Sequence, residues 1–155
     1  MNLFVDTSAL VKLYHHEAGT EAFTDLLNQY AGDLVITIAD LTRIEFHSAF
    51  LKRVRINEIA LDTVKKVFEA FDKDLQMFCV VEVDTVVKGF AMQLLDTVAY
   101  QISLRTLDAI QLATAIVSHQ VVAVDYFVVC DKNLLNVAGY YFTTFNPEVE
   151  TIKRG

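Results

Sequence analysis

The stretch that decides the fold class is LFVDTSALVKLY, residues 3–14. It opens with a short apolar run, Leu3 to Val5, which is typical of a buried strand and ends at Asp6. From Leu10 to Tyr14 the apolar side chains recur at helical spacing instead. The stretch therefore predicts a strand that runs into a helix, with a carboxylate at the junction.

The same unit recurs along the chain. Short apolar or β-branched runs predict further strands, and amphipathic stretches between them predict helices. The predicted strands cover residues 34–38, 78–83, 126–130 and 141–145; the predicted helices cover 20–30, 40–55, a segment opened by Glu58, 85–102, 107–120 and 132–138, with Asp40 and Asp84 as N-cap residues. This alternation predicts an α/β fold, with a mostly parallel sheet of about five strands covered on both faces. The length, 155 residues, and the lack of a linker predict a single domain over residues 1–155.

The apolar content, 54% of residues, requires a core, a partner or a membrane. A membrane span needs roughly 20 apolar residues. The longest uncharged run, residues 109–124, is too short and contains Gln111, Ser118 and His119. No basic region precedes the first apolar residues, so we expect no signal peptide and a cytoplasmic protein without a membrane span. Cys79 and Cys130 lie in apolar stretches, and we expect two core thiols.

The net charge of −7 argues against binding of nucleic acid through a generally basic surface. One local exception lies within the helix predicted over residues 40–55. Its basic residues are Arg43, Lys52, Arg53 and Arg55. They are either a solvated helix face or a basic edge.

Four acidic residues stand out by position. Asp6 and Asp131 follow strands, Asp108 begins an apolar helix, and Glu45 borders a stripe of apolar and small residues. Ligands of open α/β sheets bind beyond the carboxyl ends of the strands. The alternatives are structural: the three aspartates suit helix caps, 108–111 resembles a capping box, and Glu45 suits a salt bridge. Spacing alone does not separate these readings.

The surroundings of the four acids add a resemblance. Residues 4–10 (FVDTSAL), 42–49 (TRIEFHSA), 104–115 (LRTLDAIQLATA) and 128–134 (VVCDKNL) resemble, in order, the four acidic motifs of the PIN-domain ribonucleases, and most of all the VapC-type toxins. The third motif is the most specific. The segment 146–148 (NPE) is similar to the end of many such domains. The chain departs from the family in its longer segment 57–73 and its acidic charge.

The resemblance implies a three-layer α/β/α, Rossmann-like domain that cuts RNA with Mg²⁺ or Mn²⁺. It carries the acidic set over to Asp6, Glu45, Asp108 and Asp131, with Thr7 or Ser8 as a candidate hydroxyl ligand. It further implies the toxin of a type II toxin–antitoxin pair, inhibited by a small antitoxin protein, and a homodimer.

Elementary chemistry is compatible with this assignment. Mg²⁺ and Mn²⁺ prefer hard oxygen ligands, which carboxylates on separate elements can supply. Our hypothesis is that Asp6, Asp108 and Asp131 hold the principal metal, while Glu45 orients the attacking water or binds a second metal. Arg105 either contacts phosphate or pairs with a site carboxylate.

Two other classes of protein compete with the nuclease. A phosphotransfer protein is one, but a dehalogenase-like phosphatase needs a second Asp at position 8, which is Ser8, and a receiver needs a different order of acids. The other is an inactive PIN-fold scaffold, which retention of all four acids disfavours.

The helices predicted between residues 40 and 74 are also candidates for a partner surface. Their apolar residues Phe46, Phe50, Val54, Val67 and Phe71 are predicted to line a dimer or antitoxin groove.

Overall fold

The computed structural model describes residues 1–151; residues 152–155, the end of the predicted domain, lie outside the described part. Five parallel strands form one sheet in the order β3-β2-β1-β4-β5. Their bounds are β1 Asn2–Val5, β2 Val35–Ala39, β3 Cys79–Val81, β4 Tyr126–Val128 and β5 Thr144–Phe145. The predicted α/β class with a parallel sheet of about five strands is confirmed.

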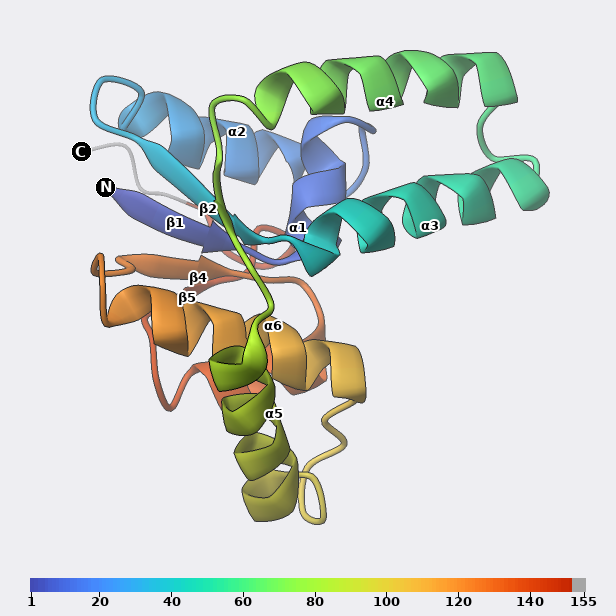
Figure 1. Ribbon diagram of the computed structural model, residues 1–155. Coiled ribbons are helices and arrows are strands. Elements are labelled where there is room, and N and C mark those ends of the chain that lie inside the picture. Colours follow the sequence, from blue (N-terminus) through green and yellow to red (C-terminus); the bar gives the residue numbers. More distant parts are fainter. Residues whose placement is uncertain (152–155) are drawn as a thin grey trace.

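The helices cover both faces of the sheet (Figure 1). They are α1 Thr7–Leu10 with the 3₁₀ turn η1 Val11–Leu13, α2 Thr20–Gln29, α3 Leu41–Arg55, α4 Leu61–Asp74, α5 Thr85–Val98, α6 Thr106–His119 and α7 Lys132–Ala138. Successive side chains of a strand point to opposite faces. Leu3 and Val5 of β1 accordingly pack with α1 to α4, whereas Phe4 packs with α5, α6 and α7. The result is a three-layer α/β/α arrangement.

Helices α3 and α4 form an antiparallel pair that extends beyond the sheet on one side (Figure 1). Aromatic rings fill the space between them, with Phe46 stacked on Phe71 at 4.0 Å between ring centroids. Phe46, Phe50 and Phe71 are fully buried, so their predicted place in a partner groove is wrong. They are core residues because α3 and α4 pack against each other and cover one another's aromatic side chains. Val54 and Val67 are only partly buried at the edge of the same cluster.

Four local predictions need correction. Asp40 does not cap α3: its backbone is already helical, and its carboxylate accepts from the Val83 backbone N–H at 3.2 Å. The helix predicted from Glu58 begins at Leu61, after a turn in which Asn57 has φ 59°. The strand predicted over 141–145 is confined to β5.

The cysteines are the fourth correction. Cys79 is exposed because β3 is an edge strand, and Cys130 is partly buried, so neither is a full core thiol; both are free.

None of the helices in residues 1–151 is long and apolar enough to cross a membrane.

Candidate active site

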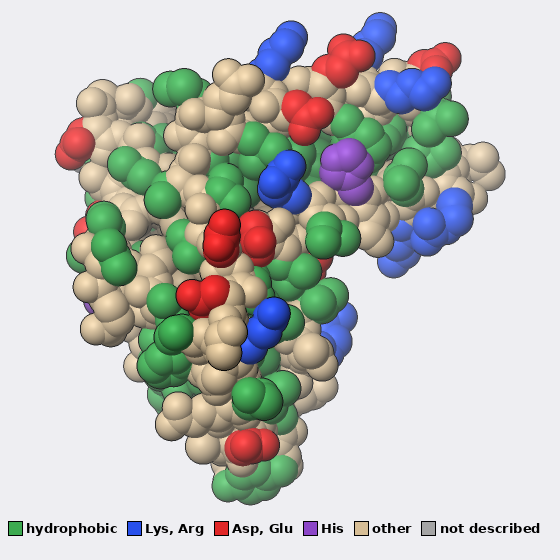
Figure 2. Space-filling model, viewed as in Figure 1, with side chains coloured by type: hydrophobic (Ala, Val, Ile, Leu, Met, Phe, Trp, Pro, Cys, Tyr) green, Lys and Arg blue, Asp and Glu red, His purple; other side chains and the backbone are tan. Residues whose placement is uncertain are grey.

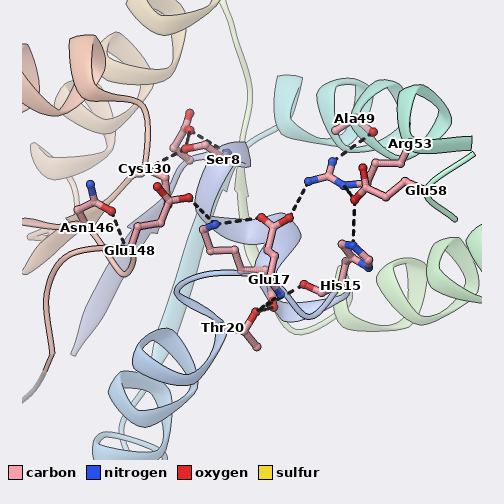
Figure 3. Close-up of polar contacts among 12 residues, drawn as sticks. Ser8, His15, Glu17, Thr20, Ala49, Arg53, Glu58, Cys130, Asn146 and Glu148 are labelled. Carbon is pink, nitrogen blue, oxygen red and sulfur yellow. Dashed lines mark hydrogen bonds and ion pairs between the residues drawn. The ribbon is translucent and has the colours of Figure 1, made fainter. Parts of the chain in front are cut away.

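Asp6 lies at the end of the central strand β1 and caps α1. Its Oδ2 accepts from the Ser8 backbone N–H at 2.9 Å and from the Ser8 hydroxyl at 2.5 Å. The Ser8 hydroxyl oxygen in turn accepts from the Cys130 N–H at 3.0 Å, which ties the ends of β1 and β4 together (Figure 3). Burial raises the pKa of Asp6 to about 6 against the lowering effect of the Ser8 hydrogen bonds, and the charges of Glu45 and Asp108 raise it further.

Asp131 and Asp108 lie at the start of two other helices. Asp131 caps α7, because its Oδ1 accepts from the Leu134 N–H at 3.0 Å. Asp108 is the third residue of α6, and its Oδ2 accepts from the Arg105 N–H at 3.2 Å, which is the carboxylate half of a capping box. The capping box predicted over 108–111 is therefore shifted by one turn. Capping occupies only part of each carboxylate, so it does not exclude a second role.

Arg105 joins these two carboxylates. Its Nε lies 3.0 Å from Asp108 Oδ2, and a terminal guanidinium nitrogen lies 3.0 Å from Asp131 Oδ2. The Arg105 side chain is 70% exposed, so the guanidinium is a solvent-facing bridge. Of the two predicted roles, the structure contains the pairing with site carboxylates. These contacts raise the pKa of Arg105, first through the hydrogen bond to Asp108.

Glu45 approaches the same region from α3. Its Oε1 accepts from the Thr7 hydroxyl at 3.1 Å and from the Gln111 side-chain amide at 2.6 Å. Burial raises its pKa against these hydrogen bonds, with Asp108 adding to the rise and Arg105 opposing it. No ion pair to Glu45 occurs within residues 1–151, so the predicted salt bridge is replaced by two neutral donors.

The four predicted acids thus come together from four elements. The charges of Glu45 and Asp108 both act on Asp6, Asp108 acts on Glu45, and Arg105 connects Asp108 to Asp131. Within the described chain, no three His, Cys, Asp or Glu side chains are arranged so that they could hold a metal ion as they lie. Instead, Arg105 engages the Oδ2 atoms of Asp108 and Asp131.

Two polar residues of the site were not predicted. Gln111 and Thr42 are buried, and the Gln111 amide donates to the Thr42 hydroxyl at 2.9 Å. Gln111 follows Asp108 by three positions, which puts both on one face of α6. The available signal was a polar side chain in a helix that is apolar nearly all round.

A second polar cluster lies beside this site (Figure 3). The Lys12 side chain is 3% exposed, and its ammonium binds Glu17 at 2.9 Å and Glu148 at 2.7 Å. Glu17 also binds Arg53 at 2.9 Å, and Glu58 lies within 3.4 Å of Arg53. Arg53 is therefore committed to internal ion pairs, and neither of the two alternatives, a solvated helix face or a basic edge, describes it.

His15 and His47 have partners outside the four acids. His15 lies 3.1 Å from Glu58, and the ring of His47 stacks on Phe68 with 3.8 Å between centroids. Neither contacts the four acids through any interaction found within residues 1–151. The four acids and Arg105 therefore remain the candidate catalytic groups at the carboxyl ends of the strands.

A parallel sheet that is covered by helices on both faces, with acidic side chains gathered beyond the ends of its strands, defines an acidic-site α/β protein. Residues 3–139 match the family model of the PIN domain. The chain belongs to the PIN-domain family, which is a family of nucleases. No curated protein matches the chain.

Solved structures show the same fold. VapBC2 from Rickettsia felis, bound to a DNA fragment from its promoter, is 12% identical with TM-score 0.65, over 94% of this chain and 100% of that one. FitAcB from Neisseria gonorrhoeae is 15% identical with TM-score 0.61, over 96% and 99%. VapC20 from Mycobacterium tuberculosis, a Sarcin-Ricin loop cleaving toxin, is 17% identical with TM-score 0.62, over 88% and 95%. At such identities the likeness concerns the fold.

Proposed function

We propose that this protein is a Mg²⁺- or Mn²⁺-dependent endoribonuclease and the toxin of a type II toxin–antitoxin pair. The observation that carries the proposal is the convergence of Asp6, Glu45, Asp108 and Asp131 from four elements of a PIN domain. The raised pKa of Asp6 supports it, because buried carboxylates in mutual repulsion favour either a proton or a cation.

The donor chemistry fits a hard divalent cation. All four groups offer carboxylate oxygens, Thr7 and Ser8 offer hydroxyls beside Asp6, and no histidine or cysteine ligand is needed. The Arg105 guanidinium already places a positive charge beside Asp108 and Asp131, so it acts as a partial substitute for a metal ion. Binding of a metal by these carboxylates requires the guanidinium to give up part of its contact.

In this proposal Asp6, Asp108 and Asp131 hold the principal metal, and Glu45 orients the attacking water or holds a second ion. A bound metal would activate water and neutralise charge on the phosphoryl oxygens. Arg105, once released from the carboxylates, is free to contact a phosphate through its exposed guanidinium. Thr7 and Gln111 hold Glu45 in place through Oε1.

The RNA-binding surface in this proposal is the C-terminal end of α3, where Lys52 and Arg55 are exposed, unlike Arg53. Arg43 is also exposed, but it lies on the opposite side of α3, beside Asp40 and Asp72. Figure 2 shows a notch between the arm made by α3 and α4 and the lobe that contains α5, with basic side chains on both borders. A local basic border compensates for the overall charge of −7, because phosphate contacts act over short distances in salt.

The proposed partners follow from the same family. The neighbours in the solved structures include a toxin–antitoxin complex from Klebsiella pneumoniae, 16% identical with TM-score 0.58. We infer a small antitoxin protein that covers the acidic site, a homodimer, and a cytoplasmic location where RNA is present. Light scattering of the protein alone and with its antitoxin tests both associations.

The test of the nuclease is cleavage of a mixed RNA pool. We expect cleavage with Mg²⁺ or Mn²⁺, none with EDTA, and none with Asp108→Asn. Asp62→Asn is the matched control, since Asp62 is 91% exposed on α4. Retained cleavage by Asp108→Asn contradicts the assignment. A wild-type protein that binds RNA without cutting it indicates the inactive scaffold, and labelling by acetyl phosphate indicates a phosphotransfer protein.

A further inference from the structure

The Gln111 side chain has an unusual position in the site. It is 1% exposed on α6, and its amide nitrogen lies 2.6 Å from Glu45 Oε1, 2.9 Å from Thr42 Oγ1 and 3.3 Å from Thr7 Oγ1. The three acceptors belong to α3 and α1, whereas Gln111 belongs to the other side of the sheet edge. One amide group thus connects three helices beside the acids.

The other end of the amide is left unsatisfied. Within residues 1–151 the buried Oε1 of Gln111 has no hydrogen-bond partner. An unpaired buried carbonyl costs free energy, and a side-chain amide can lower that cost by rotating to exchange its oxygen and nitrogen. Here rotation would face the Gln111 oxygen toward the Glu45 carboxylate, and two acceptors at that distance repel each other. The amide orientation is therefore dictated by Glu45.

The way in which Glu45 is held differs from that of its neighbours. Asp108 and Asp131 are paired with the Arg105 cation, whereas the donors to Glu45 are a neutral amide and a neutral hydroxyl. Both of these hydrogen bonds fall on Oε1. Neutral donors fix the side chain without cancelling its negative charge.

We propose that Gln111 is a positioning residue that holds the Glu45 carboxylate in its working orientation while leaving its charge and Oε2 available. This inference rests on the proposed nuclease function, in which Glu45 orients water or a second ion. Gln111 itself does not touch the substrate; it acts through Glu45.

The first experiment uses the metal-free protein. The side-chain amide of Gln111 is assigned in a ¹H–¹⁵N spectrum by its loss in Gln111→Met. We expect slow exchange of its protons in the wild type, and a changed shift in Glu45→Gln but not in Thr114→Val. Thr114 is the matched control, because it lies on the same helix, is equally buried, and donates to the Ile110 carbonyl of its own helix. A signal unmoved by Glu45→Gln overturns the proposed contact.

The second experiment is a double-mutant cycle on RNA cleavage with saturating Mn²⁺. We expect Gln111→Met to lower kcat about tenfold or more, because small misplacements of a catalytic group have effects of this order. KM stays within about twofold, and Gln111→Met has no further effect in a Glu45→Gln background. Gln111→Glu, which keeps the side-chain length but replaces the donor with an acceptor, lowers kcat at least as much.

The outcomes separate the two claims. An inactive wild type contradicts the proposed function, while the spectrum still reports on the Gln111–Glu45 contact. An active wild type in which Gln111→Met and Thr114→Val behave alike contradicts the positioning role alone. An equal loss from Gln111→Met with and without Glu45 also contradicts it, because the effect then does not pass through Glu45. Thermal melting of each variant separates a loss of fold from a loss of kcat.

Discussion

Replacing Asp6 by Asn is expected to stabilise the metal-free protein above pH 6. Asp6 is 6% exposed, and burial raises its pKa from 3.8 to about 6. Asn has the shape of the protonated carboxyl group and keeps an acceptor for the Ser8 N–H. The variant therefore resembles the wild type with Asp6 held neutral at every pH.

The sign follows from proton binding. Between pH 3.8 and about 6 the folded wild type holds a proton on Asp6 that the unfolded chain has already released. The contribution of Asp6 to stability is thus complete below the unfolded pKa and is lost as the pH rises through the folded one. The difference between 3.8 and about 6, at 1.36 kcal/mol per unit, corresponds to about 3 kcal/mol.

Urea unfolding in EDTA between pH 4 and 8 measures this difference. We expect Asp6→Asn to unfold with a free energy up to about 3 kcal/mol higher than the wild type at pH 8, with the two converging toward pH 4. Glu45, whose pKa is also raised, gives a trend of the same sign in both proteins, smaller in Asp6→Asn because the neighbouring Asp6 charge is absent. A variant that is less stable than the wild type at pH 8, or a constant offset across the range, refutes the reasoning.

Three further outcomes are expected. Lys12→Met lowers the free energy of unfolding by about 2 kcal/mol in urea, because it removes charge-assisted hydrogen bonds from a buried ammonium; an unchanged midpoint contradicts this. Gly19→Ala destabilises by more than about 1 kcal/mol, since φ is +92° and a Cβ would lie 2.9 Å from the Pro147 backbone, whereas Gly32→Ala, with open space, changes little. Arg105→Gln tightens Mn²⁺ binding, measured by paramagnetic resonance without RNA, because a competing cation is lost; weaker binding counts against this account.

The fold was predictable because its signals are local. The apolar run that ends at Asp6, and its counterpart before Asp131, locate two neighbouring strands of the sheet without any knowledge of distant contacts. Errors arose where a distant segment competes for a local group. Asp40 reads as a cap, but β3 brings the Val83 N–H to its carboxylate from more than forty residues away. Phe46 and Phe71 were predicted to line a partner groove, but the ring of each covers the other.

The site was predictable in its acids and not in their partners. The positions of Asp6 and Asp131 follow from strand ends alone, whereas the bridge through Arg105 depends on how α6 and α7 meet. Gln111 was missed as a site residue because its hydrogen bonds reach α3 and α1, and helical periodicity carries no information about neighbouring helices. Long-range polar contacts are set by packing, so only the folded chain reveals them.

The order of the strands also sets when this site can exist during synthesis. β1 lies between β2 and β4, and Leu3 of β1 pairs with Tyr126 of β4. The first strand can pair early with β2, but it waits for β4, about 120 residues further along. At roughly 5–20 residues per second this wait is on the order of ten seconds. Asp131 emerges later still. For the proposed ribonuclease, the growing chain on the ribosome is thus unable to cut RNA until the segment that carries Asp131 has emerged.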